Sequence, residues 1–165
     1  MTVALNFTVP LKQDPQSQEA LKHLAASFAE TVQEPIRRAL AVSRIVHFAR
    51  LVVIEEDQRG RYLQVLTEFD GDPQAYTEFF RKELGPVFEK IFALAEGAPP
   101  WAELNTREAF FEYTHSLNLK SLGTSTDPDD DRGFLFSAYG DKTVRELAPE
   151  PSRASGEDVA AAAHA

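Results

Sequence analysis

The stretch YLQVLTEFDGDPQ, residues 62–74, decides the fold of this chain. Residues 62–69 alternate apolar and polar side chains, as a half-buried strand does. In Asp72-Pro73-Gln74, the Asp can cap the first turn of a helix, and Pro suits the first helical position because no backbone donor is needed there. The same arrangement occurs earlier, where VALNFTV (3–9) precedes Asp14-Pro15-Gln16. A strand followed by a capped helix therefore occurs twice, which predicts a split βαβ, or ferredoxin-like, domain.

The remaining elements follow from side-chain periodicity. Residues 44–54 are rich in β-branched side chains and form the clearest predicted strand. Pro35 should end the first helix or start a short second segment, and Pro86 should kink or break the second helix near Gly85. In order, the predicted elements are strand 3–9, helix 15–33, strands 44–54 and 61–69 joined by a polar turn, helices 73–95 and 103–119, strand 134–139 and a short capped helix at 141–147.

This order predicts the α+β fold class, with a ferredoxin-like βαββαβ domain over residues 1–148 and extra helices near the C-terminus. Its four strands are expected to form an antiparallel sheet in the order 4-1-3-2, with helices on one face. Residues 149–165 show no periodicity and are predicted to be a disordered tail. The length of 165 residues suits one domain with a real core.

The second face of this predicted sheet is unusually apolar. Strand 44–54 carries apolar side chains on both sides, with Val46, Phe48, Val52 and Ile54 on one and Ile45, Ala49, Leu51 and Val53 on the other. Helices can cover only one of these sides, and the other would be an apolar patch large enough to drive association. We therefore expect a homodimer in which two sheets pack face to face.

Three segments give this chain a family resemblance. They are Val46-His47-Phe48-Ala49-Arg50, Thr67-Glu68-Phe69-Asp70-Gly71-Asp72 with Tyr76, and Tyr139-Gly140-Asp141-Lys142-Thr143-Val144. With the two strand-helix units, they resemble the dimeric α/β-barrel superfamily, and more narrowly an uncharacterised bacterial branch of it. That superfamily includes antibiotic-biosynthesis-type monooxygenases, EthD-like proteins, muconolactone-isomerase-like proteins, chlorite dismutases and dye-decolorising peroxidases. The resemblance implies a dimeric α/β barrel, and it leaves the chemistry open because this fold hosts many reactions.

Composition excludes several classes of function. The formal net charge of −9 argues against nucleic-acid binding and against anionic membrane surfaces, both of which favour basic proteins. No apolar run is long enough to cross a membrane, and no basic, hydrophobic leader is recognisable, so a cytoplasmic location is expected. The absence of cysteine excludes disulfides, thiolate catalysis and Cys-ligated metals.

His47 and Arg50 are candidate catalytic residues on the clearest strand. Because they are three positions apart, they should project to opposite faces unless a bulge intervenes. His47 could shuttle protons near neutral pH, or it could be a hydrogen-bonded structural histidine. Arg50 could bind a substrate carboxylate, or it could pair with Glu68 on the neighbouring strand.

Polar side chains at alternating positions of strands 3–9 and 61–69 are candidate ligand-orienting groups. They are Asn6, Thr8, Gln64 and Glu68. Polar groups on central strands need partners when buried. They could line a cavity in which Asn6 and Glu68 bind substrate, or they could lie on a solvated face or make hydrogen bonds at a dimer interface.

The predicted helix 103–119 supplies the other candidates. His115 could be a general base or the axial ligand of a haem, and the alternative is a structural histidine on a partly apolar helix. Tyr113 is a candidate substrate-binding residue beside it. Trp101 could pack as a lid on the core or stack on an aromatic substrate. No metal site is predicted, because the four histidines lack HxH or HxxxH spacing.

Together these features predict a cytoplasmic homodimer that binds a hydrophobic small molecule. No cofactor motif is present, and a cofactor-independent oxygenase or isomerase would need only a base, such as His47 or His115, and a dry cavity. One alternative is a haem-binding, peroxidase-like protein with His115 as the axial ligand. The other is a non-enzymatic ligand-binding or interaction module.

Overall fold

A three-stranded antiparallel sheet forms the centre of the protein. The computed structural model describes residues 2–56, 60–123 and 135–148, and the predicted tail at 149–165 lies outside them. The sheet consists of β1 (Thr2–Pro10), β2 (Val46–Glu56) and β3 (Gly60–Asp70) in the order β1-β3-β2. This is the order predicted for these three strands, and both pairings are antiparallel. With the helices described next, it confirms the α+β class.

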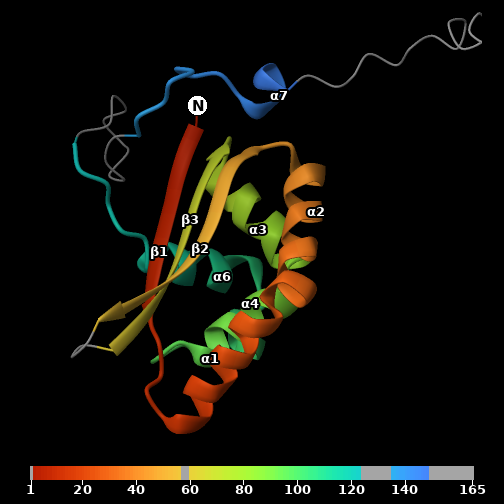
Figure 1. The fold of residues 1–165 in the computed structure, drawn as a ribbon. Helices are drawn as coiled ribbons and strands as arrows, with labels where there is room; N and C mark the ends of the chain where they lie inside the picture. Colours follow the sequence, from red (N-terminus) through yellow and green to blue (C-terminus); the bar gives the residue numbers. More distant parts are fainter. Residues whose placement is uncertain (1, 57–59, 124–134, 149–165) are drawn as a thin grey trace, which may run out of the picture.

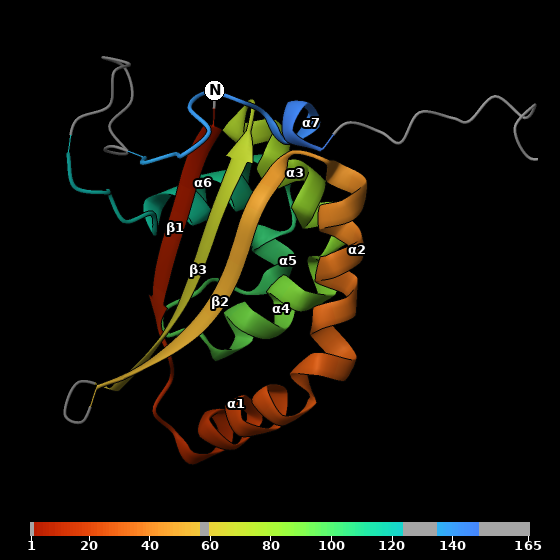
Figure 2. The same ribbon diagram turned by 45° about the horizontal axis from the view of Figure 1, so that its top comes forward.

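Helices α1 to α6 lie on one face of the sheet, and α7 lies at one end of it (Figures 1 and 2). Their bounds are α1 Pro15–Phe28, the π-helix η1 Ala29–Gln33, α2 Glu34–Ser43, α3 Pro73–Glu83, α4 Gly85–Leu94, α5 Trp101–Leu104, α6 Arg107–Ser116 and α7 Val144–Leu147. Both Asp-Pro-Gln starts behave as predicted: Asp14 accepts a hydrogen bond from the Ser17 N–H and Asp72 from the Ala75 N–H. The second long helix breaks at Leu84, beside the expected position.

The first helical segment continues past Pro35 and is bent there. Pro35 has no N–H, and in a regular helix its ring would clash with the carbonyl of Thr31. The chain widens into η1 just before Pro35, which is where a π-helical turn relieves that clash. Figures 1 and 2 show α1 and α2 meeting at an angle, so the two helices cover different parts of the sheet.

The prediction of a fourth strand at 134–139 is wrong for residues 135–139, the part that the structure describes, because these residues form irregular structure and a turn. Other segments occupy the outer edge of β1 where that strand would pair. The Leu119 N–H donates to Asn6 O at 2.7 Å, and the Asn6 N–H donates to Asn118 Oδ1 at 2.7 Å. Further along, the Glu96 N–H donates to Pro10 O at 2.7 Å. Loops after α6 and α4 thus satisfy backbone groups that a fourth strand would have used.

The register of the sheet separates its two faces. The rows that face the helices pair Val3 with Phe69, Leu5 with Thr67 and Ala49, Phe7 with Val65 and Leu51, and Val9 with Leu63 and Val53. These residues and the apolar faces of the helices form the core. The opposite face, called the open face below, carries the rows Ala4-Glu68-Phe48, Asn6-Leu66-Arg50, Thr8-Gln64-Val52 and Pro10-Tyr62-Ile54.

Candidate functional site

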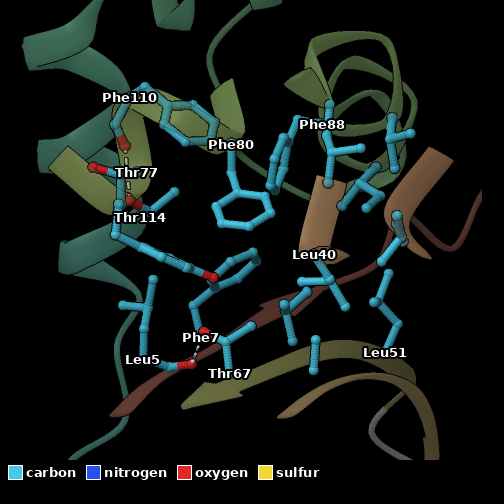
Figure 3. A pocket seen from close by; sticks show the side chains of 17 residues that line it. Leu5, Phe7, Leu40, Leu51, Thr67, Thr77, Phe80, Phe88, Phe110 and Thr114 are labelled. Atoms are coloured by element: carbon cyan, nitrogen blue, oxygen red, sulfur yellow. Dashed lines mark hydrogen bonds between the residues drawn. The ribbon is translucent and has the colours of Figure 1, made fainter. Parts of the chain in front are cut away.

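The core between the sheet and the helices is not filled. One cavity, called the tyrosine cavity below, lies between the sheet and helices α2, α3, α4 and α6, with a volume of about 50 Å³. Figure 3 shows the rings of Phe80 and Phe88 and the side chain of Leu51 around its central space. Apart from Tyr76 and three threonines, every residue that lines it is apolar, and none is charged.

A second and larger cavity lies beside the first. It is called the α1 cavity below, has a volume of about 270 Å³, and lies between the sheet, α1, η1 and α4. All of its lining residues are apolar, including Ala25 of α1 and Val32 of η1. Leu51, Val87 and Ile91 line both cavities, so the two spaces are adjacent. Together they offer an apolar interior with polar groups at one end only.

The polar groups of the tyrosine cavity come from two helices and the central strand. The hydroxyls of Thr77 and Thr114 donate to the carbonyls of Pro73 and Phe110 one turn earlier in their own helices. The Thr67 hydroxyl donates to Leu5 O at 3.2 Å. Burial raises the pKa of Tyr76 to about 12, although hydrogen bonding with Thr67 acts in the opposite direction. At neutral pH the Tyr76 phenol therefore keeps its proton and can donate a hydrogen bond.

A β-bulge places His47 on the open face. Between Val46 and Phe48 the pairing of β2 with β3 shifts by one residue, and His47 is the extra residue. His47 Nε2 lies 2.8 Å from Asp70 Oδ1, and the Thr2 hydroxyl donates to the same oxygen at 3.0 Å. The interpretation of His47 as a hydrogen-bonded sheet histidine matches this geometry.

Asp70 connects three parts of the chain. Its Oδ1 atom binds His47 and Thr2, and its Oδ2 atom accepts the Val144 N–H at the start of α7 at 2.7 Å. Burial acts to raise the pKa of Asp70, but hydrogen bonds with His47, Val144 N–H and Thr2 outweigh it, so this pKa lies below its ordinary value of 3.8. The carboxylate thus holds α7 to the end of the sheet seen at the top of Figure 1.

The open face carries the other sheet candidates. Because of the bulge, Arg50 lies on the same face as His47, in the row Asn6-Leu66-Arg50. Arg50 is exposed and forms no ion pair with Glu68 within the described parts of the chain, so the pair that the sequence suggested does not form within one copy. Burial raises the pKa of Glu68, while the charge of His47 opposes this rise. None of these side chains lines either cavity.

The candidates from the C-terminal half also lie outside the cavities. His115 is in the last turn of α6, with its ring centroid 4.0 Å from that of Phe111. Tyr113 packs edge-on against Phe92, with 5.2 Å between centroids. Trp101 packs edge-on against Phe110 and against the core. The structure therefore separates Trp101, Tyr113 and His115 from the ligand-sized space.

Neither of the two cavities fits a haem with His115 as its axial ligand. Because His115 lines neither cavity, a haem placed in either one would not meet its imidazole. Nor does the described part of the chain group three or more His, Asp or Glu side chains in a way that could hold a metal ion. Among the same residues, no helix has the length and apolar character needed to cross a membrane.

Tyr76 and Asp70 are the two residues that sequence analysis undervalued. In the sequence, both residues stand out only as members of a segment that carries the family resemblance. Their position was the signal that could have identified them, because both flank the Asp72 cap, where β3 ends and α3 begins.

Comparison with protein-family models, curated proteins and solved structures finds no match to this chain.

The Asp70 interactions predict a pH-dependent contribution to stability. Since the pKa of folded Asp70 is lowered, this contribution should be fully present above pH 3.8 and lost as the pH falls further. Asp70→Asn should reduce the free energy of unfolding by about 2 kcal/mol at pH 7, because an amide cannot replace the charged acceptor. Urea denaturation at several pH values measures the difference between the two proteins, which should shrink in acid.

The control is Asp14→Asn, in which Asn can still cap α1, so a change of at most about 0.5 kcal/mol is expected. Equal stability of Asp70→Asn and the natural protein at pH 7 would contradict the role given to Asp70. If the difference in free energy of unfolding between Asp70→Asn and the natural protein grew as the pH fell, the predicted direction of the pH dependence would be wrong.

Proposed function

We propose that this protein binds a hydrophobic small molecule in the tyrosine and α1 cavities and that it does so as a homodimer. The observation that carries the proposal is the predominantly apolar lining of two adjacent cavities with no charged residue among the described lining side chains. Ligand sites in proteins are concave and mainly apolar, with few polar groups that fix orientation. This pair of cavities has that composition.

The size of the space also supports ligand binding. Protein interiors are packed about as densely as organic crystals, and empty space in a core lowers stability. The α1 cavity, at about 270 Å³, lies just below the range of roughly 300 to 1,000 Å³ that is typical of small-molecule sites. A bound molecule would restore the missing contacts, and the exposed position of Ala25 at the lining gives it a route in.

Binding is supported better than catalysis. The lining contains one titratable group among the described residues, Tyr76, and a phenol with a pKa of about 12 is not a base at neutral pH. His47 and His115, the expected bases, lie elsewhere. A non-enzymatic ligand-binding protein is therefore the favoured form of the proposal. A cofactor-independent oxygenase or isomerase is the alternative, and it requires a base that approaches from outside this lining.

A substitution at the mouth of the α1 cavity tests the binding site. Ala25→Trp places a large side chain among the lining residues and should weaken binding of prodan, a neutral fluorescent naphthalene ketone, by about ten-fold or more. Ala26→Trp is the matched control, because Ala26 is the next residue of α1, is also exposed and lines neither cavity. Fluorescence titration gives both dissociation constants, and equal weakening or no weakening in the two variants would contradict the proposed site.

The open face is the surface that we assign to a second copy of the chain. Phe48 is 67% exposed and Ile54 38% exposed, and Val52, Tyr62 and Leu66 are partly exposed around them. In the described part of the protein, α1 to α6 lie on the other side of the sheet (Figure 2). An apolar face of this kind is typical of an association surface.

Charge supports a second copy as the occupant. Arg50 and Glu68 are on the open face in adjacent rows, and no ion pair joins them within the described chain. If Arg50 of one copy meets Glu68 of the other, a two-fold axis makes the same contact form twice. Pairing across the interface would also compensate Glu68 for the burial that raises its pKa.

Oligomeric state tests this part of the proposal. Light scattering should find a dimer at micromolar concentration. Phe48→Ser should raise the dimer dissociation constant by about thirty-fold, which corresponds to about 2 kcal/mol for a central aromatic contact. Val42→Ser is the control, because Val42 is 71% exposed but lies on α2. A monomeric natural protein, or equal effects of the two substitutions, would rule out face-to-face pairing through Phe48.

A further inference from the structure

We propose that the ligand of these cavities is a neutral molecule with one hydrogen-bond acceptor oxygen, such as a ketone, which the Tyr76 hydroxyl binds while the apolar body of the ligand fills the α1 cavity. This inference rests on the proposed function and specifies the class of ligand. It follows from the polar groups in the lining, from their rigidity and from the absence of a charged partner among the described lining residues.

Tyr76 is the lining donor best placed to bind a ligand. The Thr77 and Thr114 hydroxyls donate to backbone carbonyls of their own helices, and Thr67 donates to Leu5 O. A hydroxyl has one proton, so these three groups have none left for a ligand. The Tyr76 phenol lies in the same lining with Thr67 as its neighbour. Because the Thr67 proton goes to Leu5 O, the phenol proton is the one that a ligand oxygen can accept.

The tyrosine ring is held in a fixed position. Tyr76 lies in the first turns of α3, whose start is fixed by the Asp72 cap. Its ring stacks on Phe69 of β3, with 3.7 Å between centroids and 9° between ring planes, and it contacts the ring of Phe80 at 4.8 Å. A donor held in this way loses little entropy when it binds a ligand, and it specifies where the acceptor must lie.

The cavities select against charge. No Lys, Arg or His is among their described lining residues, so a buried carboxylate or sulfonate would have no cation to pair with. A buried ammonium group would likewise find no carboxylate. A molecule without any polar atom would fit the α1 cavity but would leave the Tyr76 hydroxyl unused. A ligand with a single neutral acceptor oxygen carries no unpaired charge and uses the Tyr76 hydroxyl.

The volumes indicate which part of the ligand goes where. The tyrosine cavity, at about 50 Å³, has more room than one water needs and suits a small polar head. The α1 cavity, at about 270 Å³, suits an apolar body. Leu51, Val87 and Ile91 border both spaces, so a ligand that reaches from one space into the other must pass these three side chains.

Three matched fluorescent probes test this inference on the full chain. They are prodan, its parent dimethylaminonaphthalene without the ketone, and the corresponding dimethylaminonaphthoate. Prodan should bind about five-fold more tightly than the parent, because it gains one hydrogen bond. It should bind at least about ten-fold more tightly than the naphthoate, because the naphthoate would bury an unpaired charge. Hydrogen bonding to the prodan carbonyl also moves its emission to longer wavelength, which gives a readout independent of affinity.

Tyr76→Phe keeps the stack on Phe69 and removes only the hydroxyl. It should abolish the advantage of prodan over the parent and move the emission of bound prodan to shorter wavelength. Tyr113→Phe is the matched control, since Tyr113 lines neither cavity, and it should change neither quantity. Thr67→Val should keep the long-wavelength emission because Tyr76 remains the donor.

The outcomes separate the two proposals. Unchanged prodan affinity and emission in Tyr76→Phe, with binding still sensitive to Ala25→Trp, would overturn the Tyr76 assignment and leave the cavity site in place. A loss of the ketone advantage in Thr67→Val but not in Tyr76→Phe would also overturn it. Prodan binding that Ala25→Trp does not weaken would overturn the proposed function itself.

Discussion

Pro35 has no amide hydrogen and would collide with the carbonyl of Thr31 in a straight helix. The helical segment of residues 15–43 therefore widens into η1 and bends. After the bend, Ile36 and Leu40 of α2 line the tyrosine cavity. Before the bend, apolar side chains of α1 line the larger α1 cavity. Val32 is buried at the bend itself. A straight helix could not follow both parts of the sheet in this way, so the ligand-sized interior depends on this local constraint.

The sheet separates the proposed ligand site and the proposed dimer surface onto its two faces. The face toward the helices forms the core and the cavity walls, and its polar residue Thr67 lies beside Tyr76. The open face combines an apolar stripe along β2 with Arg50, Glu68 and the His47–Asp70 pair. Because side chains alternate across a strand, the proposed binding interior and the proposed association surface use the same three strands without sharing residues.

Local patterns in the sequence predict much of this fold. Alternation locates β1 and β3, and the β-branched side chains of residues 44–54 locate β2. The Asp-Pro-Gln signals locate the starts of α1 and α3, because capping is a local interaction. Contacts between distant segments are not predictable in this way. The pairing of Asn118 with Asn6 displaces the expected fourth strand, and the bulge at His47 depends on its pairing with β3. The role of Tyr76 depends on the space left by α1 and α2, which no local pattern encodes.

Nuclear Overhauser effects between bound prodan and methyl groups of the protein test the central claim most directly. If the ligand occupies the interior, its ring protons should show contacts with the methyl groups of Leu51, Val87 and Ile91, which border both cavities. Contacts confined to Val52 and Ile54, the methyl-bearing residues of β2 on the open face, would contradict the account and place the ligand on the sheet surface instead.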